Sequence, residues 1–104
     1  MARTATAFQD IELLEEGTDN AVDFYEAMQR SINSGLCWQM NGSHGRSAMQ
    51  AIEAGMCLCA KQPHKDYYGN IVPSRTMLKQ GTKGTFDYVK ERMGAKYAKK
   101  MAAL

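Results

Sequence analysis

Proline is scarce in this sequence, and long apolar runs are missing altogether. Only Pro63 and Pro73 occur, and no apolar stretch approaches the roughly 20 residues that a membrane-spanning helix needs. The first residues, Met1 to Phe8, also lack the apolar core of a signal peptide. We therefore expect a protein that works in the cytoplasm and has no membrane partner.

Cysteine is too sparse for a disulfide framework, because an odd number of three fits a reducing compartment better. Cys37, Cys57 and Cys59, with His44 and His64, are the residues with the chemistry of zinc ligands. Their spacing argues against zinc, since structural sites usually draw on pairs with two to four intervening residues. We interpret the cysteines as small buried apolar residues and expect no metal, no cofactor and no catalytic activity. A zinc- or cysteine-dependent enzyme is the alternative that we rank lowest.

The charges are distributed unevenly along the chain although they nearly balance. Residues 1–60 hold three basic and eight acidic residues, a net charge of −5. Residues 61–104 hold ten basic and three acidic residues, a net charge of +7. Such asymmetry indicates a basic surface for an acidic partner, or pairing between the two parts of the chain within a monomer or across a homodimer.

Apolar periodicity predicts helices at both ends of the chain. We expect one helix over residues 7–16 and another over about 19–33, the latter capped by Thr18 or Asp19. A third helix is predicted from Thr85, its cap, to the end of the sequence. The methionines on predicted helical faces, which are Met28, Met49, Met93 and Met101, are interpreted as core residues.

The middle of the chain is harder to assign. Leu36–Met40 fits a strand or a buried turn, and the breaker residues that follow predict a turn. We interpret Gly42–Ser47 as that turn rather than as a phosphate-binding loop, because glycines and a cap account for it. Ser47 has capping-box spacing, which predicts a helix to about Gly55. Met56–Ala60 fits either a continuation of that helix or a strand.

Residues 61–84 have no helical period and form a long basic loop or hairpin segment. Tyr67, Tyr68, Ile71 and Val72 can form a small hairpin around Gly69 and Asn70. Together these features predict a single compact domain over residues 1–104, mainly α with three to four helices and a small β-hairpin, in the α or α+β class.

Cations and aromatic side chains are interleaved in this segment. Tyrosine and arginine are favoured in protein interfaces, and the same mixture suits single-stranded nucleic acid, where rings stack on bases. The alternative is that the tyrosines cover the core while the lysines only solvate the loop. The predicted partner-binding residues are Lys65, Tyr67, Tyr68, Arg75, Lys79, Lys83, Lys90 and Lys96.

Three stretches of the chain, Asn41–Ser47, Tyr67–Arg75 and Gly81–Gly84, together resemble small proteins encoded by tailed bacteriophages. The resemblance covers the central half of the chain and contains no catalytic motif. It implies a protein of the host cytoplasm that binds and inhibits or redirects host machinery, including restriction and CRISPR systems.

We therefore expect a non-enzymatic interaction protein that binds a larger host protein or nucleoprotein complex through a basic surface of tyrosine, lysine and arginine. A nucleic-acid-binding accessory protein is the main alternative.

Overall fold

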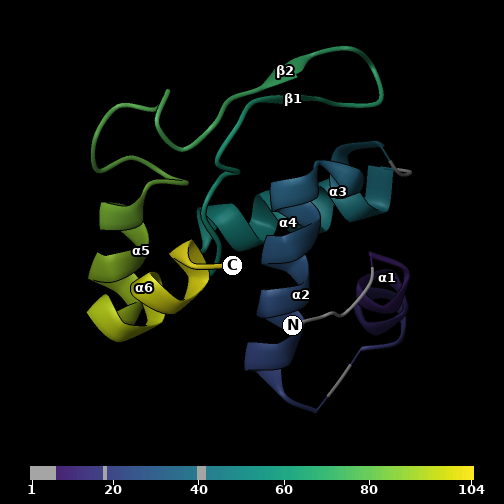
Figure 1. Cartoon of the computed structure of the whole chain (residues 1–104), viewed down its shortest axis with the longest axis horizontal. Helices are drawn as coiled ribbons and strands as arrows, with labels where there is room; N and C mark the ends of the chain where they lie inside the picture. Colours follow the sequence, from purple (N-terminus) through teal and green to yellow (C-terminus); the bar gives the residue numbers. More distant parts are fainter. Residues whose placement is uncertain (1–6, 18, 40–41) are drawn as a thin grey trace.

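Within the described part of the chain, four helices precede a short two-stranded sheet in sequence order and two helices follow it (Figure 1). The computed structural model describes residues 7–17, 19–39 and 42–104. The prediction of a mainly α fold with a small β-hairpin is confirmed. The elements are α1 (Ala7–Glu16), α2 (Ala21–Ser34), α3 (Leu36–Gln39), α4 (Gly42–Glu53), β1 (His64–Lys65), β2 (Ile71–Val72), α5 (Phe86–Met93) and α6 (Ala95–Ala102).

The start of α2 is set by a side chain that the sequence analysis did not select. The Asn20 carboxamide oxygen accepts hydrogen bonds from the backbone N–H groups of Val22 at 2.9 Å and Asp23 at 3.2 Å. Asn20 is therefore the N-cap, and the prediction of Asp19 is wrong. Thr18 lies outside the described residues.

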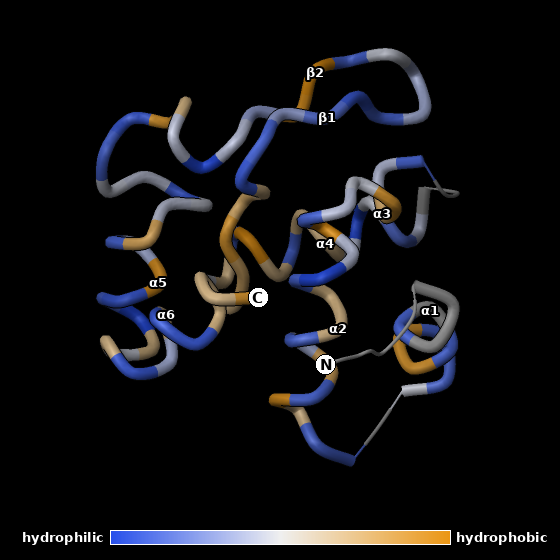
Figure 2. Tube along the Cα trace, in the orientation of Figure 1, coloured by the Kyte–Doolittle hydropathy of each residue, from blue (hydrophilic) through white to orange (hydrophobic). Residues whose placement is uncertain are grey.

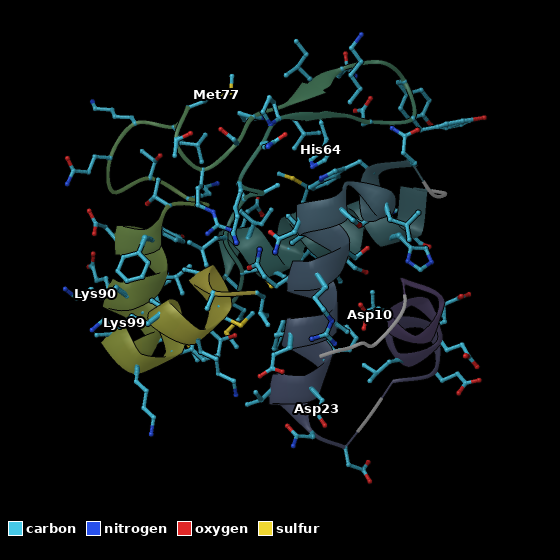
Figure 3. All side chains as sticks on the ribbon, in the orientation of Figure 1. Asp10, Asp23, His64, Met77, Lys90 and Lys99 are labelled. Carbon is cyan, nitrogen blue, oxygen red and sulfur yellow. The ribbon has the colours of Figure 1, made fainter. Side chains whose placement is uncertain are left out.

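An ion pair joins α1 to α2. The buried carboxylate of Asp10 meets the guanidinium of Arg30 through two nitrogens, each 2.9 Å from an oxygen. Figure 3 shows Asp10 on the side of α1 that faces α2. The hydrogen bond to Asp10 raises the pKa of Arg30, so this guanidinium stays charged. The pair fixes how α1 lies on α2, because a bidentate arginine–carboxylate contact is directional.

The chain after α2 is helical in two places where a strand or a turn was expected. Leu36–Gln39 forms α3, and residues 42–47 form the first turns of α4, so the interpretation of Gly42–Ser47 as a turn is wrong. Ser47 lies inside the helix and is not its cap. Met40 and Asn41 lie outside the described residues.

Packing of α4 on α3 explains why a glycine-containing stretch is helical. A Cβ added to Gly45 would lie 3.9 Å from Cε3 of Trp38 and 3.9 Å from the carbonyl oxygen of Cys37. These are ordinary van der Waals distances, so α4 packs on α3 at this point without requiring glycine, and the packing offsets the roughly 1 kcal/mol by which glycine disfavours a helix.

A buried apolar segment, residues 57–60, connects α4 to β1 through the centre of the molecule. Figure 2 shows it as an orange stretch between these two elements. It is neither of the two predicted alternatives, helix or strand, but an irregular segment held by its neighbours. The N–H of Cys59 donates to the oxygen of Gly84 at 3.0 Å, and the oxygen of Ala60 accepts from the N–H of Arg75 at 2.9 Å.

Gln29 of α2 supplies two further hydrogen bonds to this segment. Its side chain is 0% exposed, its Nε2 donates to the oxygen of Leu58 at 3.0 Å, and its Oε1 accepts from the N–H of Leu58 at 2.7 Å. The Gln29 amide thereby satisfies both backbone hydrogen-bonding groups of Leu58, which would otherwise need a neighbouring strand.

The hairpin is antiparallel, with His64 opposite Val72 and Lys65 opposite Ile71. It is attached to the helices at its base. The imidazole Nε2 of His64 donates to the backbone oxygen of Asn33 at 3.0 Å, and the Gln39 amide donates to the backbone oxygen of Lys65.

The last part of the chain forms two helices where one continuous helix was predicted. Thr85 caps α5 as expected, because its hydroxyl accepts from the N–H of Tyr88 at 3.3 Å. Gly94 then has φ 93° and ψ 161°, a conformation that is almost restricted to glycine, and it separates α5 from α6. The break lets Val89 of α5 and Met101 of α6 both reach the core.

One buried cluster draws side chains from every helix from α2 to α6 and from residues 57–60. The hairpin lies above it in Figure 1, with α1 and α2 at one side and α5 and α6 at the other. None of the described helices has both the length and the apolar character needed to cross a membrane.

Candidate partner-binding surface

The structure places five of the predicted partner-binding residues in two separate areas. Lys65, Tyr67 and Tyr68 belong to the hairpin, whose connecting loop lies at the upper right of Figure 1. Lys90 on α5 and Lys96 on α6 belong to the opposite, lower left part, where Figure 3 labels Lys90 and Lys99. The residues therefore do not form one continuous basic surface.

A single carboxylate organises the hairpin loop. Asp66 Oδ1 accepts hydrogen bonds from the N–H groups of Tyr68 at 2.9 Å and Asn70 at 2.8 Å. The backbone of Asp66 bonds to Asn70 and Gly69 as well, and Gly69 takes a positive φ of 86° that closes the turn. Because the strands contain only two residues each, Tyr67 and Tyr68 lie in this loop rather than on a strand.

The two tyrosine rings are stacked on each other and are open to solvent. Their centroids are 5.3 Å apart with an interplanar angle of 23°, and the residues are 65% and 84% exposed. The alternative interpretation, in which these tyrosines cover the core, is therefore wrong. Large aromatic surfaces held outside a core are typical of contact sites.

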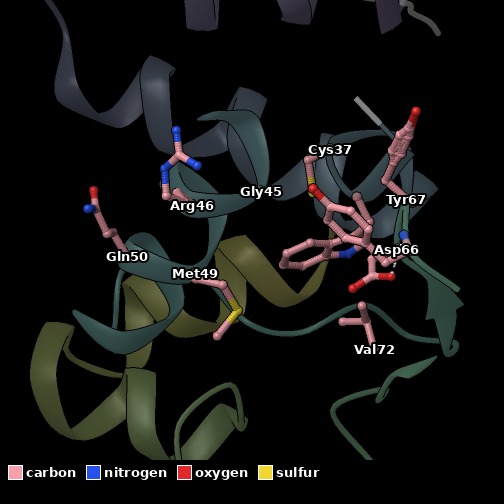
Figure 4. A pocket seen from close by; sticks show the side chains of 10 residues that line it. Cys37, Gly45, Arg46, Met49, Gln50, Asp66, Tyr67 and Val72 are labelled. Atoms are coloured by element: carbon pink, nitrogen blue, oxygen red, sulfur yellow. Dashed lines mark hydrogen bonds between the residues drawn. The ribbon is translucent and has the colours of Figure 1, made fainter. Parts of the chain in front are cut away.

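The tyrosines border a cavity of about 510 Å³ between the hairpin and α3–α4, which we call the tyrosine groove. Its apolar lining consists of Cys37, Trp38, Met49, Tyr67, Tyr68 and Val72. Figure 4 shows Met49 of α4 and Val72 of β2 on facing sides of the groove. The volume falls in the range of about 300–1,000 Å³ that is usual for ligand pockets.

Trp38 contributes an unusual polar group to this lining. The residue is 6% exposed, and its indole N–H is buried without a hydrogen-bond acceptor in the part of the chain that the structure describes. A buried donor left unpaired costs about 1–3 kcal/mol. Such a group calls for an explanation, and a ligand that supplies an acceptor is one.

The charged side chains in the lining of the groove are one cation and one acid. Arg46 and Gln50 are exposed on α4, and Arg46 has no ion-pair partner among the described residues. Lys65 is exposed on β1 but is not part of the lining, because it lies opposite Ile71 on the other face of the hairpin from Val72. Asp66 also lines the groove, but its carboxylate already accepts hydrogen bonds from the loop.

Arg75 is directed into the molecule, where its hydrogen bonds stabilise the fold. Its guanidinium donates to the oxygen of Cys59 at 2.8 Å and to the side-chain oxygen of Asn33 at 3.4 Å, and its burial lowers the pKa. Arg75 thus ties the 73–85 segment to the core.

The second area is the exposed face of α6. Its exposed positions are Ala95, Lys96, Lys99 and Lys100, so every exposed polar side chain there is a lysine. Lys100 also bonds Glu26 of α2 at 2.7 Å, and Lys83 lies 3.6 Å from Glu53 of α4. The acidic first part of the chain therefore neutralises the basic part at two places.

The remaining predicted cations are exposed but isolated. Lys79 lies in the loop after β2. Lys90 shares α5 with Arg92, whose guanidinium lies 4.4 Å from the centre of the Tyr88 ring. The two acids of this helix, Asp87 and Glu91, reduce its net charge. α5 is therefore a weaker candidate for an anion-binding face than α6.

The cysteines are buried, as predicted. Burial raises the pKa of Cys37 to about 12, and it raises those of Cys57 and Cys59 as well, so all three remain thiols at neutral pH. The described residues contain no group of three metal-ligating side chains. Both histidines are half-buried.

Sequence reasoning missed two residues of the groove. Met49 was interpreted as a core residue, but it is 45% exposed and lines the groove. Met93 is also partly exposed, whereas Met28 and Met101 are in the core as predicted. Trp38, the single tryptophan, was placed only in a short apolar stretch. Its rarity was the one available signal for a functional residue.

Residues 1–73 match the model of a protein family described as "Domain of unknown function (DUF7417)". The match spans more than half of the chain, so the protein belongs to this family, and it includes the hairpin and all residues of the tyrosine groove. No curated protein and no solved structure matches the chain.

Proposed function

We propose that this member of the DUF7417 family is a non-enzymatic interaction protein, which attaches to a larger host protein or nucleoprotein complex through the tyrosine groove. The observation that carries the proposal is the pair of stacked, exposed rings of Tyr67 and Tyr68 beside an apolar cavity. Rigid aromatic anchors next to an apolar pocket are where most of the binding energy of protein interfaces resides.

The mechanism that we propose is occlusion. Asp66 holds the loop, so little conformational freedom is lost when the two rings dock on the partner. Bound in this way, the chain covers the surface that the partner uses for its own ligand. The resemblance to tailed-phage proteins supports a phage-encoded inhibitor of a host system, for example a CRISPR defence complex, that acts in the host cytoplasm.

The test is capture of the partner from host cells with tagged protein, followed by calorimetric titration of the partner identified by mass spectrometry. We expect Tyr68→Ala to weaken binding by about tenfold or more, as truncation of an interface anchor does. Met77→Ala is the matched control, because Met77 is 59% exposed and lies outside the groove. Equal affinity of both variants and the wild type refutes the proposal, provided that circular dichroism shows all three folded.

A second candidate function is nucleic-acid binding through α6, and the lysines on its exposed face favour it. A gel-shift series on single- and double-stranded oligonucleotides at two salt concentrations tests it, since phosphate contacts give a steep loss of affinity with salt. The double variant Lys96→Glu and Lys99→Glu should abolish the shift. The same charge change at Lys61 and Lys79, which are exposed elsewhere, should leave most of it. A shift that is insensitive to salt or to the α6 variant contradicts this function.

A further inference from the structure

From the outer edge of the hairpin we infer that the free protein pairs with a second copy of itself along strand β2. The inference concerns the chain before it meets a host partner, so it goes beyond the proposed function. Three observations carry it: an open backbone edge at Ile71, the exposed apolar side chains beside that edge, and the absence of exposed charge among residues 67–78.

The register of the hairpin leaves the backbone of Ile71 unpaired. In an antiparallel ladder, pairs that exchange hydrogen bonds alternate with pairs whose N–H and C=O groups point away from each other. The N–H of Asp66 donates to the oxygen of Asn70 at 2.9 Å. The adjacent pair, Lys65 and Ile71, is therefore of the second kind, and the oxygen of Lys65 bonds outward to Gln39. The N–H and C=O of Ile71 point to the opposite side, where no other described segment bonds to them.

The three most exposed large apolar side chains of the described residues lie beside this edge. Ile71 is 66% exposed, Tyr67 65% and Tyr68 84%. Figure 2 shows the apolar strand β2 at the top of the molecule, away from the central core. Apolar surface that is concentrated in this way on a small domain is typical of a protein contact.

The lack of exposed charge favours a second copy as the occupant. None of the exposed residues between 67 and 78 is charged, although 23% of the whole chain is. A two-fold axis brings each surface against itself, so a charged edge would repel its counterpart and an uncharged one does not. Lys65 lies across the hairpin from Ile71. In the paired sheet it is three strand spacings from its counterpart, about 14 Å, which exceeds the roughly 8 Å over which charges interact at physiological salt.

The two-fold axis passes beside Ile71. Its N–H donates to the oxygen of Ile71 of the second copy and its oxygen accepts in return, so two hairpins join into one four-stranded antiparallel sheet. Pro73 has no N–H and ends the new ladder two residues further along. The other edge of the hairpin, β1, is attached to α3 through Gln39. The assembly therefore closes at two copies.

The area of this contact predicts a weak dimer. A large aromatic residue can bury about 150–250 Å², so the two tyrosines and Ile71 offer roughly 400 Å² on each copy. With Gly69 and Asn70, which are also exposed, two copies bury about 1,000 Å² in total, the lower limit for a specific interface. We expect a dissociation constant on the order of 10–100 µM. A host partner that binds the tyrosines can then displace the second copy.

Sedimentation equilibrium of the full chain from about 1 to about 500 µM tests the dimer. We expect the average mass to rise from that of one chain toward that of two and no further. Ile71→Lys should weaken dimerisation by about tenfold or more. Val22→Lys is the matched control, because Val22 is 39% exposed on α2, whose start lies at the opposite end of the molecule in Figure 1. It should change the dissociation constant by less than about twofold.

Disulfide trapping locates the axis. Opposed residues of a hydrogen-bonded antiparallel pair have Cα atoms about 5.5 Å apart, within the reach of a disulfide. Ile71→Cys should therefore form a covalent dimer in oxidised glutathione, whereas Val22→Cys should not. The three native cysteines are buried and should not react.

Salt separates this dimer from the pairing of acidic and basic parts of two copies. An apolar contact with backbone hydrogen bonds should keep its affinity between about 0.05 and about 0.5 M salt, because screening acts on charges. Dissociation by salt contradicts the inference and indicates charge pairing.

The inference is also overturned if the chain stays monomeric, if its mass rises past two copies, if Ile71→Lys and Val22→Lys behave alike, or if Ile71→Cys gives no covalent dimer. Circular dichroism of each variant confirms the fold. Failure of the proposed function is distinguishable, because Ile71 does not line the tyrosine groove. A monomeric chain whose capture still depends on Tyr68 refutes only the dimer, and capture that is independent of Tyr68 refutes only the proposed function.

Discussion

Replacement of Gln29 by leucine tests how the centre of the fold is held together. The Gln29 side chain is fully buried and makes two hydrogen bonds to the backbone of Leu58, at 3.0 Å and 2.7 Å. Leucine has a similar volume but can neither donate nor accept. The Gln29→Leu variant therefore leaves the N–H and the C=O of Leu58 buried and unpaired.

The expected loss of stability is large for a domain of this size. Each of the two unpaired backbone groups costs about 1–3 kcal/mol. The greater apolar surface of leucine offsets about 1–2 kcal/mol of this. We expect the free energy of unfolding to fall by about 1–4 kcal/mol, out of the roughly 5–15 kcal/mol that is usual for whole domains.

Urea unfolding followed by far-ultraviolet circular dichroism and by Trp38 fluorescence measures this change. The matched control is Gln50→Leu, at an exposed position of α4 that makes no such backbone bonds, and its effect should stay within about 0.5 kcal/mol. If Gln29→Leu lowers the free energy of unfolding by less than about 1 kcal/mol, the buried amide does not hold residues 57–60 as described.

Three further perturbations probe other parts of the molecule. Gly84→Ala should lower the free energy of unfolding by about 1–3 kcal/mol more than Gly81→Ala. Both glycines have a positive φ, but only a Cβ at Gly84 would lie 2.5 Å from Cys59 Sγ. Equal denaturant midpoints of the two variants would refute this. Asp66→Ala should weaken partner binding in calorimetry by about tenfold with little loss of thermal stability, because it releases the tyrosine loop; unchanged affinity contradicts the role of Asp66. Above about pH 9 the unfolded state ionises its thiols while the folded state keeps Cys37 protonated, so the free energy of unfolding should fall by up to about 1.4 kcal/mol per pH unit for each such thiol. Cys37→Ala should make that decline shallower in denaturant titrations between pH 8 and 11, and an identical slope would argue against burial of this thiol.

The elements that the sequence predicted correctly depend on short-range interactions. The bounds of α1 and the cap at Thr85 follow from patterns within one or two helical turns. The presence of a hairpin follows from the turn residues Gly69 and Asn70, although its first strand is His64–Lys65 and not the predicted Tyr67–Tyr68. In each case the residues that determine the structure are neighbours in the chain, so the pattern could be recognised without a tertiary model.

The candidate site depended on contacts between distant parts of the chain. The tyrosines were recognised from composition alone, but the cavity beside them exists only because α4 and the hairpin both pack on α3. Met49 was misassigned because helical periodicity identifies a face and does not reveal whether another element covers it. The hydrogen bond from Arg75 to Cys59 could not be predicted, since it joins residues that no local pattern links.

By itself, the sequence determined the helical class, the small hairpin and the presence of exposed aromatic and basic side chains in the second part of the chain. Tertiary packing decided that residues 42–47 are helical, that the last helix breaks at Gly94 and that the basic residues divide between two areas. The physical reason is that local preferences differ by about 1 kcal/mol or less per residue. Burial of a large side chain contributes about 1.5–3 kcal/mol and therefore overrides them wherever the two conflict.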